Sequence, residues 1–315
     1  MSPVVKKAAR VLVPLLFFAI VAWLLQGKLS ELDTDKLVEA VRSISAARIA
    51  LAASLTAAAY LVLASYDQLA IRHVASNVGR ARALAIAFVS YAFNFNIGAI
   101  AGGLGFRYRL YSKTGVANDD IAAIAVFSIV TNWTGCLTVL GVALLVDPSA
   151  LERGWGFAPL AGRSLGALSL SVVAAYVAAC RFKRGTIAFR SWRYGLPDQR
   201  TGLMQVGLAS CFWLLVSGVI YVLGPSGREL GYQTVLASFA IASLAGLIIR
   251  IPAGLGVIEA VFIQIMGGAI GLSSVLAMLL AYRAIFLLAP LVVAALVLAF
   301  LEWRGARRGA VAASS

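Results

Sequence analysis

The chain has 315 residues, of which 61% are hydrophobic and only 13% are charged. Soluble domains contain about one half apolar and about one quarter charged residues, so this composition excludes a soluble globular protein and indicates an integral membrane protein. The net charge is +14, but the basic residues lie in short clusters between apolar runs. This pattern favours anionic lipid headgroups as partners and argues against nucleic acid.

The N-terminal part of the chain contains the first predicted membrane helix. Residues 8–26 form an apolar run behind a basic segment, and no small-x-small cleavage motif follows, so we expect an uncleaved anchor. In the next segment, residues 30–45, apolar side chains from Leu37 to Ile44 recur at helical spacing with charges between them. This segment is predicted to form a short amphipathic helix at the membrane surface.

The rest of the chain is a series of apolar runs, most of them near the ~20 residues that cross a bilayer core. The runs cover residues 46–70, 84–104, 121–146, 160–179, 203–223, 235–249, 254–270 and 273–301. They predict an all-α, polytopic membrane protein with about six to eight transmembrane helices plus one or two re-entrant, broken helices. We expect a single transmembrane domain over residues 1–304 and a cytoplasmic tail over residues 305–315.

The distribution of lysine and arginine predicts the orientation, because cytoplasmic loops are enriched in both. If the run 84–104 crossed the bilayer, Arg107, Arg109 and Lys113 would face outward and break this rule. If the run instead enters and returns on one side, most of the 27 basic residues lie on that side, together with both termini. We therefore expect a re-entrant segment here and cytoplasmic N- and C-termini.

Two apolar segments contain residues that interrupt helices. Several glycines between residues 98 and 105 favour a break or a close helix contact in the first. In the second, residues 241–268, Pro252 lies close to Gly254 and Gly256, and proline neither donates a backbone hydrogen bond nor tolerates a helical residue before it. Broken hydrophobic segments in both halves of a chain are typical of a transporter's central site. Sequence identity between the two segments is negligible, so an inverted repeat is a hypothesis.

Three ionisable residues lie within the C-terminal apolar runs. We identify Glu259 as the only acidic residue deep inside an apolar run, and Arg250 and Arg283 as the only basic ones. Each costs about 2.5–3.5 kcal/mol at a helix centre on insertion scales, so we expect Glu259 to pair with one of the arginines. Such a pair either fixes helix packing or lends an arginine to an anionic substrate, and the two roles are compatible.

Other polar side chains have two interpretations each. Asn94, Asn96 and Asn132 lie within apolar runs, where they either form interhelical hydrogen bonds or line a headgroup pathway. Arg107 and Arg109 alternate with aromatic residues in the sequence FRYRLYSK at a predicted membrane boundary. These arginines either anchor the chain at the interface or bind a lipid phosphate.

The motifs of common enzyme classes are absent from the sequence. It contains no GxSxG elbow, no HExxH pair and no P-loop. Cys136, Cys180 and Cys211 lie in or beside apolar runs, and His73 is the only histidine, so a zinc or haem site is not predicted. We expect a protein without enzymatic activity, metal or cofactor.

Three stretches resemble the lysylphosphatidylglycerol synthase transmembrane region, the flippase part of the bacterial multiple peptide resistance factor. They are SYAFNFNIGAIAGGLGFRYRLYSKTGV, VFSIVTNWTG and IPAGLGVIEAVF. The resemblance implies translocation of an anionic or modified phospholipid between the leaflets of the bacterial inner membrane. We expect no lipid aminoacylation, because the cytosolic synthase domain of the larger relatives is not expected in this chain.

The resemblance and the buried charges together give the candidate substrate-binding residues. They are Asn94, Asn96, Gly102, Gly103, Arg107, Arg109, Asn132, Arg250, Pro252, Gly254, Gly256, Glu259 and Arg283. The alternative function is a non-transporting membrane subunit that recruits or regulates a lipid-synthesising enzyme through the basic loop 181–202. GxxxG spacings at residues 98–102 and 267–271 allow helix contacts within one chain or in an oligomer.

Overall fold

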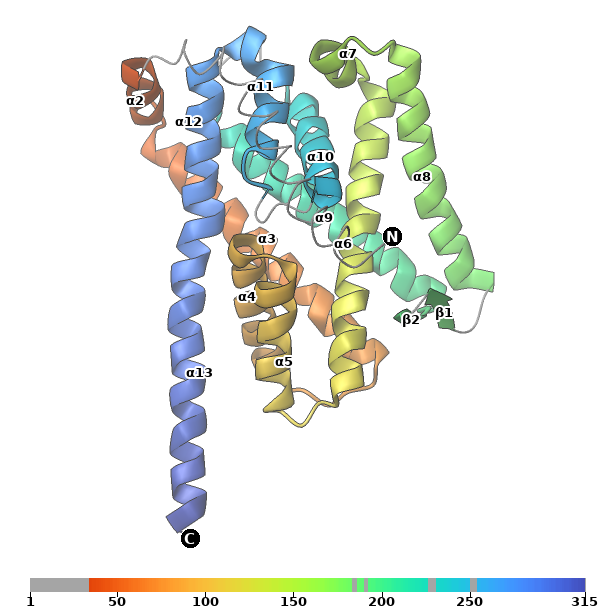
Figure 1. Cartoon of the computed structure of the whole chain (residues 1–315), viewed down its shortest axis with the longest axis vertical. Coiled ribbons are helices and arrows are strands. Elements are labelled where there is room, and N and C mark those ends of the chain that lie inside the picture. The colour runs from red at the N-terminus through yellow and green to blue at the C-terminus, as the bar shows by residue number, and fades with distance from the viewer. Residues whose placement is uncertain (1–33, 183–185, 190–191, 226–230, 250–253, 315) are drawn as a thin grey trace, which may run out of the picture.

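The structure is a computed structural model that describes residues 34–182, 186–189, 192–225, 231–249 and 254–314 (Figure 1). The predicted first span, residues 8–26, lies outside this part of the chain. The elements are α2 (Thr34–Arg42), α3 (Ala46–His73), α4 (Arg80–Ile97), the π-helical turn η1 (Ala99–Leu104), α5 (Gly105–Ser112), α6 (Asn118–Val146), α7 (Ser149–Trp155), α8 (Pro159–Phe182), β1 (Thr186–Phe189), β2 (Trp192–Gly195), α9 (Gln199–Leu223), α10 (Tyr232–Ile249), α11 (Val257–Ile270), α12 (Leu272–Tyr282), the π-helical turn η3 (Arg283–Leu288) and α13 (Ala289–Ser314).

Five helices of the described chain are long and apolar enough to cross a membrane: α3, α6, α8, α9 and the continuous helix α12–η3–α13. The shortest of them has 24 residues and extends about 36 Å, which exceeds the ~30 Å of a bilayer core. These spans confirm the predicted polytopic, helical membrane protein. The amphipathic helix predicted before the second apolar run is also present, as α2.

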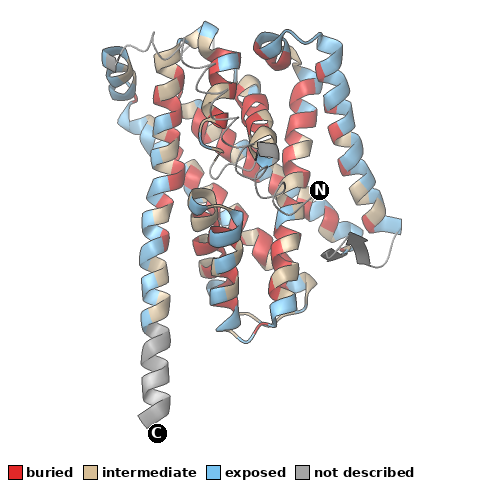
Figure 2. Cartoon of the chain, in the orientation of Figure 1, coloured by how far each residue is buried: buried red, intermediate tan, exposed pale blue. Residues whose placement is uncertain are grey.

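The core of the bundle lies where α3, α6 and α9 pack together. Helix α3 crosses the molecule obliquely against α9, and α6 stands between α9 and α8 (Figure 1). Buried residues concentrate along these inner helices, whereas α8 and the span containing α13 are largely exposed (Figure 2). In a membrane, lipid tails cover the outward apolar faces of these outer helices.

Helices α4 and α5 form a hairpin that enters the bundle and returns to the same end. Helix α4 has 18 residues and α5 has 8, and neither is among the helices that are both long and apolar enough to cross a membrane. The rings of Phe93 and Phe106 stack across the hairpin with centroids 4.1 Å apart. Gly98 ends α4 with a φ of 102°, a left-handed angle that favours glycine. A Cβ on Gly102 would lie 2.3 Å from the carbonyl oxygen of Phe93, so the two arms approach too closely for any side chain there. The chain thus turns back at Gly98, as the predicted re-entrant segment requires.

Helices α10 and α11 form a second hairpin, which enters from the opposite end (Figure 1). Both of its outer ends contact α7. Arg153 donates a hydrogen bond to Thr234 at the start of α10, and Gln264 of α11 donates to the carbonyl oxygen of Gly154. The predicted break at Pro252 lies outside the described residues, while α10 ends before it and α11 starts after it. The two hairpins thus point into the molecule from opposite ends.

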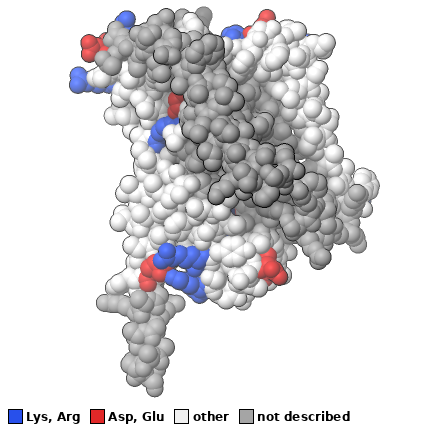
Figure 3. Space-filling view, in the orientation of Figure 1, with Lys and Arg blue, Asp and Glu red and all other residues white. Residues whose placement is uncertain are grey.

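A short antiparallel hairpin of β1 and β2 follows α8, with Thr186 paired to Gly195. The sequence did not predict these strands, because the basic loop that contains them lacks an alternating apolar pattern. They lie beside the lower end of α8 in Figure 1. Charged side chains of the visible face gather at both ends of the molecule, with one small pair of opposite charges between them (Figure 3).

Candidate functional site

The tips of both hairpins contact the same π-helical turn, η3. Arg283 opens this turn, about 16 Å along a 32-residue helix, so η3 lies in the middle third of its span. The side-chain amide of Asn96, at the tip of the lower hairpin, donates 3.2 Å to the carbonyl oxygen of Leu287. From the upper hairpin, Glu259 accepts a hydrogen bond from Arg283. π-helical turns often occur at functional sites because they free backbone groups and redirect side chains.

Glu259 and Arg283 form an ion pair within the membrane-spanning region. Arg283 Nε donates 2.7 Å to Glu259 Oε1, which confirms the predicted pairing and selects Arg283 as the partner. Glu259 Oε2 accepts a hydrogen bond of 2.9 Å from the backbone N–H of Gly256. This second contact places the carboxylate at the start of α11, where the helix dipole stabilises negative charge. Arg250 and Pro252 lie outside the described residues.

The Glu259–Arg283 pair is accessible and incompletely hydrogen-bonded. The side chains are 20% and 15% exposed, respectively. Arg283 Nη2 lies 2.6 Å from Glu259 Oε1 but makes no hydrogen bond with any group in the described chain. Nη2 itself is buried against the carboxylate, whereas the side chains of the pair are partly exposed.

An aromatic cluster holds η3 in place. The rings of Tyr60 and Phe286 lie 5.4 Å apart, and the Tyr60 hydroxyl donates 3.2 Å to the carbonyl oxygen of Phe286. Tyr282 stacks on Phe286 at 5.4 Å, and Phe95 of α4 lies 5.8 Å from the same ring. A π-turn leaves carbonyl groups without regular helical partners, and in a membrane these must be satisfied by protein or water. Tyr60 and Asn96 supply such partners.

A second ion pair, which the sequence did not reveal, joins Asp67 of α3 to Arg107 of α5. Arg107 Nη2 and Nε donate to Asp67 Oδ1 and Oδ2 at 2.9 and 3.1 Å. The hydroxyl groups of Tyr111 and Ser128 complete the shell at 3.0 and 2.9 Å. Asp67 is fully buried and Arg107 is 5% exposed. The guanidinium carbon also lies 4.6 Å from the centre of the Tyr91 ring, a cation–π distance.

Arg107 is therefore in the interior and not at a lipid interface, in contrast to the expectation from the FRYRLYSK stretch. Its partner was missed because Asp67 lies close to the end of a predicted span, six residues before His73. From the sequence alone, a carboxylate near the end of a span is interpreted as a residue at the membrane interface. The available signal was that Asp67 falls inside the run 46–70, which makes it a second acidic residue within a predicted span.

Comparison of the sequence with known proteins places the chain in a family. The sequence profile described as "Lysylphosphatidylglycerol synthase TM region" matches residues 11–308. The chain belongs to this family. It is similar to "Inner membrane protein YbhN" of Escherichia coli, with 30% identity over 298 residues that cover 94% of this chain and 93% of that protein. It is also similar to "Uncharacterized protein slr0712" of Synechocystis sp., with 28% identity over 305 residues and coverage of 96% and 95%.

The remaining candidate residues of this family member fall into three places. Asn94 lies against Gly103 inside the lower hairpin, and Gly254 and Gly256 have positive φ angles at the start of α11. Arg109 lies at the mouth of the lower hairpin, where it donates 3.1 Å to a carboxylate of α13. The candidate set thus covers both hairpins and is not one compact cluster.

Asn132 lies apart from the η3 site, at the contact between α6 and α9. Its backbone carbonyl accepts a hydrogen bond of 3.0 Å from the indole of Trp213. Next to it, Thr131 accepts 2.7 Å from Gln205. These bonds match the interhelical interpretation of this polar stretch, whereas a pathway role for the Asn132 side chain remains a prediction.

The structure offers no evident metal centre in its described part. No group of three or more histidine, cysteine, aspartate or glutamate side chains comes together there. The polar groups of the site are the side chains of Arg283, Glu259 and Asn96 and the N-terminus of α11. Together these groups can bind and release an anion.

Proposed function

We propose that this protein translocates the headgroup of an anionic or modified phospholipid between the leaflets of the bacterial inner membrane. The observation that carries the proposal is the convergence of two oppositely inserted hairpins on η3, beside the accessible Glu259–Arg283 pair. Paired broken segments that meet within the bilayer are the arrangement in which membrane transporters hold their substrates. Membership in the family supports a membrane domain of this kind.

The Glu259–Arg283 pair supplies a mechanism for binding a phosphate group. Arginine binds phosphate through two parallel hydrogen bonds, and Arg283 is partly exposed beside a carboxylate that a phosphate can replace. A phosphate that displaces Glu259 from Arg283 also comes near the start of α11, where backbone N–H groups and the helix dipole favour an anion. The acyl chains remain in lipid throughout, because only the headgroup needs a polar path.

The mouth of the lower hairpin is the proposed docking position for the headgroup. Arg109 and Lys113 both bind Glu302 of α13, and all three side chains are substantially exposed. A lipid phosphate can replace Glu302 between these two cations. Arg107 does not take part, because Asp67 and the surrounding side chains occupy its donors.

The orientation in the membrane belongs to this proposal. The mouth of the lower hairpin and the lower ends of α3 and α9 carry basic residues, which cytoplasmic surfaces prefer. We therefore place this end in the cytoplasm together with both termini. A protein that moves lipid without modifying it requires no catalytic group, so the proposed activity is not enzymatic.

The proposal is tested by lipid scrambling in proteoliposomes. Fluorescent phosphatidylglycerol and phosphatidylcholine analogues report transfer between leaflets through quenching by a membrane-impermeant reductant. We expect transfer of at least the anionic analogue above empty liposomes. Glu259→Gln and Arg283→Gln should slow it about tenfold or more, the effect of removing a charge-assisted hydrogen bond.

Matched controls separate a loss of the site from a change of surface charge. Glu152→Gln and Arg163→Gln change exposed residues of α7 and α8 and should transport normally. Transfer equal to that of empty liposomes for several lipid classes would defeat the proposal. Equal rates for the wild-type and the Glu259→Gln protein would remove the assigned site.

The alternative function is recruitment of a lipid-synthesising enzyme by a subunit that does not transport. The observation that favours it is the β1–β2 hairpin, which gives the basic loop a defined shape at the end of the bundle. Scrambling by the purified protein alone argues against this alternative. Absence of scrambling together with an enzyme that co-purifies in equal amounts, and is lost when the loop is neutralised, supports it.

A further inference from the structure

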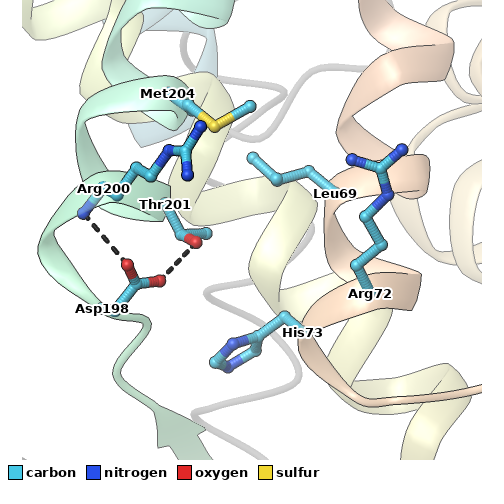
Figure 4. A pocket seen from close by; sticks show the side chains of 7 residues that line it. All are labelled: Leu69, Arg72, His73, Asp198, Arg200, Thr201 and Met204. Carbon is cyan, nitrogen blue, oxygen red and sulfur yellow. Dashed lines mark hydrogen bonds between the residues drawn. The ribbon is translucent and has the colours of Figure 1, made fainter.

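A groove separate from η3 lies at the lower end of the bundle, between the end of α3 and the start of α9. It encloses about 520 Å³, within the range of small-molecule sites. Its lining residues are Leu69, Arg72, His73, Asp198, Arg200, Thr201 and Met204. Figure 4 shows the guanidinium groups of Arg72 and Arg200 on opposite walls of this groove.

The two arginines of the groove are available for an anion. No ion pair or hydrogen bond of the Arg72 or Arg200 side chain is found within the part of the chain that the structure describes. Asp198, the acidic residue of the lining, is already engaged in capping α9. Its Oδ2 accepts from the backbone N–H of Arg200 at 3.2 Å, and its Oδ1 accepts from the Thr201 hydroxyl, which lowers the pKa of this carboxyl group.

The groove combines these cations with an apolar wall. Leu69 is buried and Met204 is exposed on the facing helix. His73 forms part of the floor, and its Nε2 lies 3.0 Å from the carbonyl oxygen of Gly195, a contact that orients the imidazole. A ligand with an anionic group and an apolar or neutral body matches this arrangement.

We propose that this groove binds a phosphate group, carried by a phospholipid headgroup or by a soluble phosphate ester. Two guanidinium groups on one groove favour phosphate, because each arginine forms paired hydrogen bonds with its oxygens. The site is formed by the ends of α3 and α9 and shares no residue with the Glu259–Arg283 pair. The groove is therefore a second site, distinct from the one proposed at η3.

The single histidine of the chain gives a site-specific measurement. Tag-free protein labelled with ¹⁵N-histidine, in nanodiscs of phosphatidylcholine, has one imidazole signal, that of His73. Glycerol 3-phosphate and inorganic phosphate are titrated into these nanodiscs, with sodium chloride at equal ionic strength as the blank. In a second arm, phosphatidylglycerol replaces part of the phosphatidylcholine, and no soluble phosphate is added.

We expect a saturable shift of the His73 signal in one of the two arms. A shift with soluble phosphate assigns the site to a phosphate ester, and a shift with phosphatidylglycerol alone assigns it to a lipid headgroup. The double variant Arg72→Gln, Arg200→Gln should weaken the response at least about tenfold, since it removes charge-assisted hydrogen bonds. Arg80→Gln, at an exposed residue on the same end of the molecule, should leave it unchanged.

Three outcomes overturn the proposal: no shift in either arm, a shift equal to the sodium chloride blank, or an equal loss in Arg80→Gln and in the double variant. The His73 signal without ligand and the circular dichroism spectrum show that each variant is folded. Scrambling activity of the double variant separates the two proposals. Normal scrambling with loss of the His73 response leaves the translocation site intact and supports an independent phosphate site.

Discussion

The two ion pairs within the membrane-spanning region differ in how completely they are satisfied. Asp67 accepts four hydrogen bonds from three side chains and is fully buried. Glu259 accepts from one arginine and one backbone N–H, and its side chain is 20% exposed. Burial of a charge is tolerated when hydrogen bonds replace the lost water, so the first pair is a closed structural unit. The second pair is open to replacement of one partner.

The positions of the two pairs fit this difference. Asp67, Arg107 and Ser128 come from α3, α5 and α6, so the first pair ties the lower hairpin to two long helices. Glu259 and Arg283 come from the upper hairpin and from η3, the turn that both hairpins contact. We infer that the first pair fixes the scaffold and that the second allows its partners to exchange.

The largest expected effect comes from breaking the closed pair. Asp67→Asn leaves Arg107 charged, buried and without its counter-ion, so it should lower the free energy of unfolding by about 3–5 kcal/mol. Unfolding in mixed detergent micelles with increasing sodium dodecyl sulfate measures this loss. Glu152→Gln, an exposed charge, is the control.

A double-variant cycle sharpens this test. Arg107→Gln added to Asp67→Asn removes the unpaired charge, so the double variant should be more stable than the sum of the two single changes implies. Additive losses, or a loss below about 1 kcal/mol for Asp67→Asn, would show that the pair does not hold the scaffold.

An intermediate effect is expected in the backbone of the lower hairpin. Gly102→Ala would place a Cβ 2.3 Å from the carbonyl oxygen of Phe93, so the hairpin must open. The expected loss of stability is about 3 kcal/mol, typical of overpacking. Gly207→Ala in α9 is the matched control, because no atom lies within 4 Å of the added Cβ, and it should be neutral or stabilising. Equal stabilities of the two variants would contradict a rigid hairpin.

A smaller effect on stability is expected at the open pair, and the smallest at the exposed Glu302. Glu259→Gln should cost about 1–2 kcal/mol, because Arg283 retains access to water or to a lipid phosphate. The exposed contact of Glu302 with Lys113 provides a lower reference, where Glu302→Gln should cost at most about 1 kcal/mol and less at high salt. The same unfolding series measures both. A loss for Glu259→Gln as large as that for Asp67→Asn would make the two pairs equivalent and refute the comparison.

Much of the fold was predictable because membrane-spanning helices require long apolar runs, which are visible in the sequence. The apolar runs predicted the spans, and the basic residues after residue 105 predicted that the chain turns back within the run 84–104. The break predicted at Pro252 lies outside the described residues. The pairing of Glu259 with Arg283 was also predictable, since an isolated charge in a bilayer needs a partner and few candidates were available.

Other features could not be predicted from one sequence. The partner of Asp67 is 40 residues away on a helix that re-enters the membrane, and no local pattern encodes that distance. The π-turn at Arg283 lies in an apolar run whose Pro290 follows the turn by two residues, and proline cannot donate a backbone hydrogen bond to the carbonyl oxygen of Phe286. The proline signals a disturbed helix, but not that Tyr60 and Asn96, from distant helices, donate to the carbonyl oxygens of Phe286 and Leu287.

The π-helical turn also determines which way the end of α13 faces. Such a turn contains one residue more than an α-helical turn, so it rotates every later side chain by about 100° around the helix axis. Glu302, about 21 Å further along, meets Lys113 and Arg109 in this rotated position. If η3 relaxed to a regular helix, Glu302 would swing away from α5. The contact of Glu302 with α5 therefore depends on the π-helical conformation of η3, about 21 Å away along the helix.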